Sequence, residues 1–204
     1  AIFLAGLWPA VLLGRRQRGQ PGVSRTSRVF ALLILACALP TQAVDFLTNF
    51  DLDVTLPFHL SDLAWIAAAA ALWTQHRYPV ALTYFWGLVL TTQAIVTPSL
   101  GEDFPELRFF AFWGLHLMIV WAAVFLVWGC GLSPDWSDYR VTVATTLVWA
   151  VAAYSFNAVA GTNYGYLQRK PSSGSLLDYL GPWPVYVFAE IAIVAVVWAL
   201  MTWP

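Results

Sequence analysis

Hydrophobic residues along this chain gather into long, nearly unbroken runs separated by short polar stretches. The runs cover residues 1–14, 28–45, 57–74, 79–98, 109–132, 141–160 and 183–203. A helix needs about 20 apolar residues to cross the hydrocarbon core of a bilayer, and every run but the first is close to that length. The pattern therefore predicts an all-α, polytopic transmembrane helix bundle of about seven spans, the first of them incomplete, forming one domain over residues 1–204.

The composition supports the same class of protein. Hydrophobic residues make up 60% of the chain and charged residues only 10%, a balance typical of a polytopic membrane protein. No soluble domain is left over between the spans. The first run has no basic residue before it and no small-residue cleavage pattern after it, so we do not interpret it as a signal peptide.

The charged residues sort by the side of the membrane that each loop faces. Segment 15–28 holds five arginines, which places it in the cytoplasm by the positive-inside rule. Alternation puts Arg77 and Arg140 on that side too, and the N-terminus outside. The opposite loops carry seven acids and three bases: Asp45, Asp51, Asp53, Glu102, Asp103, Glu106 and Asp178 against Arg108, Arg169 and Lys170. Topology and anionic lipid headgroups explain the arginine cluster, so we expect no nucleic-acid partner.

Polar side chains inside the apolar runs share one depth. Counting 1.5 Å of rise per residue places them all in the outer half of the bilayer, although they come from five spans: His59, Asp62, Gln93, His116, Asn157 and Glu190. Ionisable groups inside a membrane are functional candidates by default. The sequence therefore predicts a polar cavity that opens toward the outer leaflet beneath the acidic loops.

The stretch Leu56-Pro57-Phe58-His59-Leu60-Ser61-Asp62 opens the third run. Pro57 suits the first turn of a helix, which would place His59 and Asp62 on one face and Asp62 beyond the first turn. The alternative is that Ser61 and Asp62 only favour the positive end of the helix.

This set of residues suits acyl chemistry. His59 or His116 can act as a general base, with Asp62 orienting an imidazole. Amide groups of Gln93, Asn157 or Asn163 can stabilise an oxyanion. The alternatives are that His116 only packs and that Gln93 only joins two helices by a hydrogen bond.

The loop after residue 160 combines turn formers, aromatic rings and two cations. Its residues Asn163, Tyr164, Arg169 and Lys170 are candidates for binding a lipid headgroup, together with Glu190 from the last span. The alternative is that the two cations anchor the next helix at headgroup level.

Two segments carry a resemblance to a known family. Residues 163–171 read N-Y-G-Y-L-Q-R-K-P and residues 180–184 read L-G-P-W-P. With His59 and His116, these segments resemble the YwaF-like integral membrane family of bacteria over nearly the whole chain, which implies a multi-pass protein of the bacterial plasma membrane. A similar eukaryotic branch includes a phospholipid acyltransferase thought to use a cysteine beside a histidine in a P-C-H stretch. Phe58 stands at that place here, and Ser61 is the nearest alternative nucleophile.

The leading hypothesis is a membrane-embedded protein that transfers or hydrolyses the acyl chains of a phospholipid or other acyl lipid without a cofactor. A zinc-dependent variant would use His59, Asp62, His116 and Glu190. Two alternatives are a non-catalytic assembly or lipid-binding subunit and a small proton-coupled transporter. The apolar inner halves of the spans argue against transport, and the sequence names no protein partner.

Overall fold

Helices make up all the regular structure of the part of the chain that the computed structural model describes, residues 2–98, 101 and 103–203. The α-helices are α1 (Ile2–Arg15), α2 (Arg25–Thr48), α3 (Leu60–Thr74), α4 (Arg77–Phe85), α5 (Thr91–Val96), α6 (Leu107–Val124), α7 (Trp136–Ala160) and α8 (Val185–Thr202). The π-helical segments η1 (Trp86–Leu90) and η2 (Phe125–Gly129) continue α4 and α6, and the short 3-10 helices η3 (Tyr164–Tyr166) and η4 (Leu176–Leu180) lie between α7 and α8. The predicted all-α bundle is confirmed.

Five of the described helical segments are long and apolar enough to cross a membrane, namely Arg25–Thr48, Arg77–Val96, Leu107–Gly129, Trp136–Ala160 and Val185–Thr202. The helices α1 and α3 are apolar but shorter. The prediction that the third span begins at residue 57 was wrong by three residues. Asp62 accepts a hydrogen bond from the backbone N–H of His59, which makes His59 the N-cap and starts α3 at Leu60.

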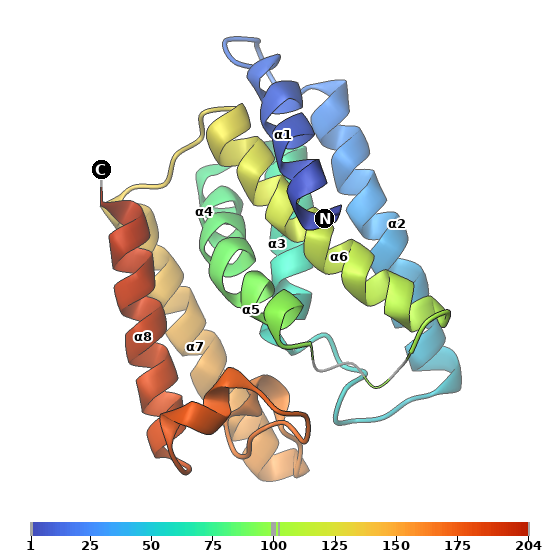
Figure 1. Cartoon of the computed structure of the whole chain (residues 1–204), viewed down its shortest axis with the longest axis vertical. Helices are drawn as coiled ribbons and strands as arrows, with labels where there is room; N and C mark the ends of the chain where they lie inside the picture. The colour runs from blue at the N-terminus through green and yellow to red at the C-terminus, as the bar shows by residue number, and fades with distance from the viewer. Residues whose placement is uncertain (1, 99–100, 102, 204) are drawn as a thin grey trace.

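The helices run up and down, so their loops gather at two ends (Figure 1). The loops α1–α2, α3–α4 and α6–α7 lie at one end, which we call the arginine-rich end. The loops α2–α3 and α7–α8, the C-terminus of α5 and the N-terminus of α6 lie at the other, which we call the acidic end (Figure 1). The orientation of these ends across a membrane stays a prediction.

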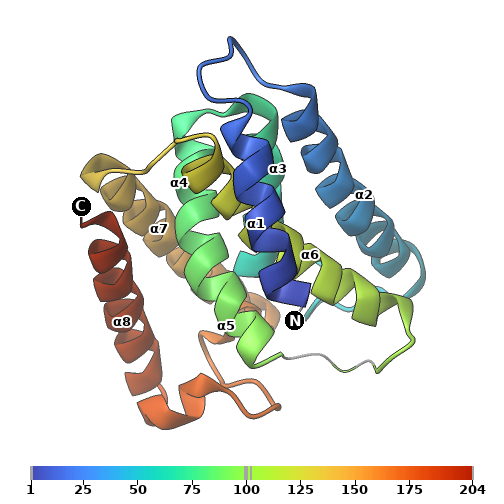
Figure 2. The same cartoon turned by 45° about the horizontal axis from the view of Figure 1, so that its top comes forward.

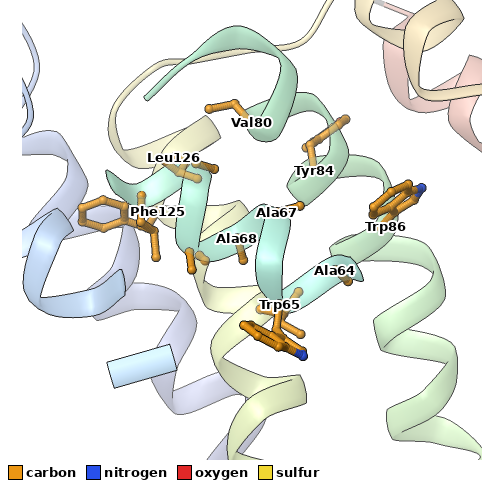
Figure 3. Close-up of a cluster of buried hydrophobic side chains, with 14 of the residues drawn as sticks. Ala64, Trp65, Ala67, Ala68, Val80, Tyr84, Trp86, Phe125 and Leu126 are labelled. Carbon is orange, nitrogen blue, oxygen red and sulfur yellow. The ribbon is translucent and has the colours of Figure 1, made fainter. Parts of the chain in front are cut away.

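Helix α3 lies at the centre of the bundle, packed against α2, α4 and α6. Its buried face is built of alanines, including Ala64, Ala67 and Ala68, which lie among larger side chains such as Phe125 and Leu126 (Figure 3). Small residues let helix backbones approach closely in membrane proteins. The run of alanines, which in the sequence indicates only an apolar helix, therefore allows three neighbouring helices to pack closely around α3.

Helix α1 packs against η2 through two glycines. A Cβ atom built on Gly14 would lie 2.5 Å from the Cα of Gly129, closer than any side chain tolerates. Arg18 closes the same contact by donating from Nε to the carbonyl oxygen of Gly129 at 2.7 Å.

Helices α7 and α8 form a pair beside the other helices (Figures 1 and 2). Hydrogen bonds tie this pair to the segment α4–η1 on the arginine-rich side. Trp198 Nε1 donates to the carbonyl oxygen of Phe85 at 3.1 Å, and Trp86 Nε1 donates to Thr146 Oγ1 at 2.9 Å. Helices α7 and α8 thus contact the bundle directly at Trp198 and Trp86. The space between this pair and the other helices lies nearer the acidic end.

Candidate functional site

A cavity of about 530 Å³ lies between the α7–α8 pair and helices α2, α3, α5 and α6. Its polar lining lies toward the acidic end, and its lining on the deeper parts of α7 and α8 is largely apolar. Polar and charged lining residues include Thr41, Asp45, His59, Ser61, Asp62, Gln93, Arg108, His116, Tyr166 and Glu190, and deep lining residues include Val143, Leu147, Val194, Ala195 and Trp198. The cavity is therefore amphipathic along its length.

His59 lines the cavity at the start of α3. Its ring Nδ1 accepts a hydrogen bond from the backbone N–H of Gly165 at 3.4 Å, and its ring lies 4.8 Å from that of Tyr164. Asp62 lines the cavity too, but its Oδ2 accepts from the backbone N–H of His59 at 3.0 Å. This carboxylate therefore bonds to the backbone of His59 and not to its imidazole, so the predicted orienting role of Asp62 gains no support.

His116 lines the cavity from α6 and is 7% exposed. Its ring Nδ1 lies 2.7 Å from the carbonyl oxygen of Phe112, one turn earlier in the helix. A carbonyl only accepts, so Nδ1 carries the proton and Nε2 is the ring atom able to take one up. Among the described residues, no hydrogen bond joins His116 to His59 or to a carboxylate.

Gln93 and Glu190 complete the predicted residues that line the cavity, Gln93 from α5 and Glu190 from α8. Glu190 makes no hydrogen bond or ion pair with another described residue. Five of the ten predicted site residues thus meet at one cavity, and their chemical roles stay predictions.

Asn157 does not line the cavity; it fixes the loop that covers it. The residue is fully buried, its Nδ2 donates to the carbonyl oxygen of Tyr164 at 2.9 Å, and its Oδ1 accepts from Thr162 Oγ1 and from the backbone N–H of Tyr164, both at 2.8 Å. With these bonds made, the amide is committed to the backbone turn, and its position does not support the predicted role in substrate binding.

Tyr164 and Asn163 are likewise structural. Tyr164 is fully buried, and its hydroxyl donates to the carbonyl oxygen of Leu52 at 2.6 Å and accepts from the backbone N–H of Leu56 at 3.1 Å. Burial raises the pKa of this hydroxyl, which keeps it protonated. Asn163 bonds to the backbone of Gln168 and Arg169. Both residues shape the loop beside His59, and neither lines the cavity.

The two loop cations also lie outside the cavity lining. Arg169 Nη2 lies 3.7 Å from Asp53 Oδ1, while Lys170 Nζ lies 3.8 Å from Asp178 Oδ1 and 5.5 Å from the ring centre of Tyr186. Whether they bind a headgroup or anchor the next helix at headgroup level stays a prediction. Arg108, whose place in the sequence predicted only a charge of the acidic loops, lines the cavity.

Phe58, at the position where the resemblance places a cysteine, is an aromatic packing residue. Its ring lies 5.6 Å from that of Phe156 and 5.7 Å from that of Tyr164, and its carbonyl oxygen accepts from Trp149 Nε1 at 3.0 Å. Ser61 does line the cavity. Position 58 therefore supplies no thiol in this chain.

Within the described residues, no three His, Cys, Asp or Glu side chains come together as a set that could hold a metal ion. His59, Asp62, His116 and Glu190 line the same cavity but do not converge on one point. The zinc-dependent alternative therefore has no ligand set in this part of the chain.

Comparison with known families decides the class of protein. The model of the TMEM164 family matches residues 1–202. The chain belongs to the TMEM164 family. No curated protein and no solved structure matches it significantly. With its five apolar helices of spanning length, this member of the TMEM164 family is a multi-pass membrane protein.

Proposed function

We propose that this TMEM164-family chain binds a phospholipid or other acyl lipid in the cavity and breaks its acyl ester, passing the acyl group to a hydroxyl acceptor or to water. The observation that carries the proposal is the amphipathic cavity of about 530 Å³, with histidines and carboxylates toward the acidic end and apolar residues as far as Trp198. Binding sites for small molecules are mostly apolar with a few placed polar groups. A bacterial plasma membrane, as the YwaF-like resemblance implies, is part of the same proposal.

In the proposed reaction, Nε2 of His116 takes the proton from the attacking hydroxyl or water as its oxygen bonds to the ester carbonyl carbon. The bond from that carbon to the original alcohol oxygen then breaks, and the leaving oxygen takes the proton back from the imidazolium. In this proposal the amide of Gln93, which lines the same cavity, donates to the oxyanion that forms in between. No covalent enzyme intermediate is needed, in keeping with the phenylalanine at position 58.

The test uses the purified chain in lipid nanodiscs that contain a phospholipid with an isotope-labelled acyl chain and an unlabelled lysophospholipid. Mass spectrometry follows the label into the acceptor or into free fatty acid. His116→Gln should lower the rate about 100-fold or more, as expected for the loss of a general base. His76→Gln is the matched control, because His76 is exposed at the arginine-rich end, outside the cavity. An unchanged rate in His116→Gln overturns the catalytic assignment.

A second candidate is a lipid-binding protein without chemistry. The observation that favours it is that the ring of each cavity histidine is hydrogen-bonded to a backbone group, His59 to Gly165 and His116 to Phe112. No described carboxylate is hydrogen-bonded to either ring. This candidate predicts that labelled phospholipid is bound stoichiometrically and recovered unchanged.

Transport is the least favoured function. The deep lining of the cavity consists of residues such as Val143, Val194 and Trp198, and Trp198 is hydrogen-bonded to the backbone of Phe85. Among the described lining residues, no polar path continues from the cavity to the arginine-rich end.

A further inference from the structure

Arg108 is the permanent cation among the described residues that line the cavity. It lies in the first turn of α6 and forms an ion pair with Asp45, which lines the cavity from the last turn of α2. The other two cations of the acidic end, Arg169 and Lys170, lie outside the lining and contact Asp53 and Asp178. An anionic group in the cavity would therefore meet Arg108 rather than the loop cations.

The spacing along α6 relates Arg108 to the candidate base. Arg108, Phe112 and His116 follow one another at intervals of four residues, which places them on one helix face, and all three line the cavity. Arg108 and His116 are about 12 Å apart along the axis. A lipid whose headgroup lies at Arg108 and whose chains point toward Trp198 would therefore present its acyl esters between Arg108 and His116.

We propose that Arg108 binds the phosphate of the lipid headgroup and that Asp45 both positions the guanidinium and disfavours headgroups with further negative charge. A planar guanidinium carries five N–H donors, so it can contact a carboxylate and a phosphate on different edges. The Asp45 carboxylate next to it repels a second negative charge on the ligand. This inference rests on the proposed function for the class of lipid and adds the residues that recognise its headgroup.

The test measures lipid binding by the full chain in detergent, with native mass spectrometry of phosphatidylcholine, phosphatidic acid and diacylglycerol. Arg108→Gln should weaken the binding of phosphatidylcholine about tenfold or more, the effect of losing a charge-assisted hydrogen bond, and leave diacylglycerol unaffected. Arg169→Gln, which removes a cation outside the lining, is the matched control and should bind all three lipids like the native chain.

Asp45→Asn breaks the ion pair but keeps Arg108, and it should increase the binding of phosphatidic acid relative to phosphatidylcholine. If Arg108→Gln binds phosphatidylcholine as tightly as the native chain, the headgroup assignment is wrong while the proposed function stands. Equal loss of all three lipids in Arg108→Gln and Asp45→Asn would show that the pair is only structural, which also overturns the assignment. A native chain that binds none of the three lipids contradicts the proposed function itself.

Discussion

Oδ2 of Asp62 accepts a hydrogen bond from the backbone N–H of His59 at a distance of 3.0 Å. The contact joins the first turn of α3 to the residue that precedes it, a side-chain cap of the kind that starts many helices. The imidazole of His59 is held separately, by the backbone N–H of Gly165 and by the ring of Tyr164. The side chains of His59 and Asp62 therefore line the same cavity, and their hydrogen bonds hold the start of α3 and the loop after α7.

The cap predicts different effects for two substitutions of Asp62. Asp62→Ala leaves the N–H of His59 without its acceptor and should destabilise the protein by about 1 kcal/mol. Asp62→Asn keeps an oxygen that can accept the same hydrogen bond, so it should destabilise the protein by only a few tenths of a kcal/mol. Thermal unfolding in detergent, followed by tryptophan fluorescence, measures both.

Glu106→Ala is the control for this series, because Glu106 is the N-cap of α6 but makes no side-chain cap bond. It should leave the melting temperature unchanged. Equal destabilisation by Asp62→Asn and Asp62→Ala would show that the negative charge of Asp62, and not its cap bond, stabilises the fold.

Asn157 supports a second prediction. Replacing it by Ala would leave the backbone groups of Tyr164 and the hydroxyl of Thr162 without their partner in a buried site. Unsatisfied buried groups cost about 1–3 kcal/mol each, so Asn157→Ala should destabilise the protein by about 3 kcal/mol and make the loop after α7 sensitive to protease. Melting temperature and limited proteolysis report the two effects.

Ser155→Ala is the matched change on the same helix, since Ser155 is exposed and bonds only to the carbonyl oxygen of Val151. It should leave both stability and cleavage rate as they are. A loop that stays resistant in Asn157→Ala would show that Tyr164 holds the loop without the amide.

The sequence alone was enough to predict the helices, because runs of about 20 apolar residues have few other solutions. The helical rise of about 1.5 Å per residue also predicted a shared depth for His59, Gln93, His116 and Glu190, and these four residues line the cavity. Depth alone does not determine which way a side chain points or which distant backbone group it meets. For that reason Asn157, at the same predicted depth, was indistinguishable from them in the sequence.

Arg108 was missed for the opposite reason. A charge at the end of a span is usually read as a topology signal, and its partner Asp45 is distant in the sequence. Its four-residue spacing to Phe112 and His116 was the available signal. The predicted start of α3 was wrong because proline suits a turn as well as the first position of a helix. The hydrogen bond from the backbone N–H of His59 to Asp62 shows that Pro57 lies in the turn before the helix.

Asp135 predicts a dependence of stability on pH at the arginine-rich end. Backbone N–H groups of Asp138 and Ser137, together with Arg77, hold the pKa of Asp135 below its usual range. A lowered pKa in the folded state means that the ionised group stabilises the fold at neutral pH, and that this contribution is lost as pH falls below the ordinary value of about 3.9.

Asp135→Asn keeps an oxygen that can cap α7 but removes the charge. The difference in melting temperature between the native chain and this variant should be constant between about pH 7 and pH 5 and shrink below about pH 4. Ser137→Ala, which keeps the backbone N–H, should show the native pH profile. A difference that grows as the solution is acidified would contradict the assigned direction of the pKa shift.

The deep end of the cavity predicts selectivity for acyl-chain length. Ala195 lines this end, one turn of α8 before the buried ring of Trp198. Ala195→Phe would fill apolar space that a long acyl chain requires, while the polar groups at His59 and His116 stay as they are. We therefore expect the variant to bind or convert short-chain phospholipids like the native chain and to lose most of its capacity for long chains. A series of phospholipids that differ only in chain length, measured by native mass spectrometry, gives the profile.

Val196→Phe is the matched control for Ala195→Phe, because Val196 is 59% exposed and does not line the cavity. It adds the same ring on the outer face of α8 and should leave the chain-length profile unchanged. If Ala195→Phe weakens all chain lengths equally, the ring has disturbed the packing of α8. If neither variant changes the profile, the acyl chains lie elsewhere, and the apolar end of this cavity does not hold the substrate.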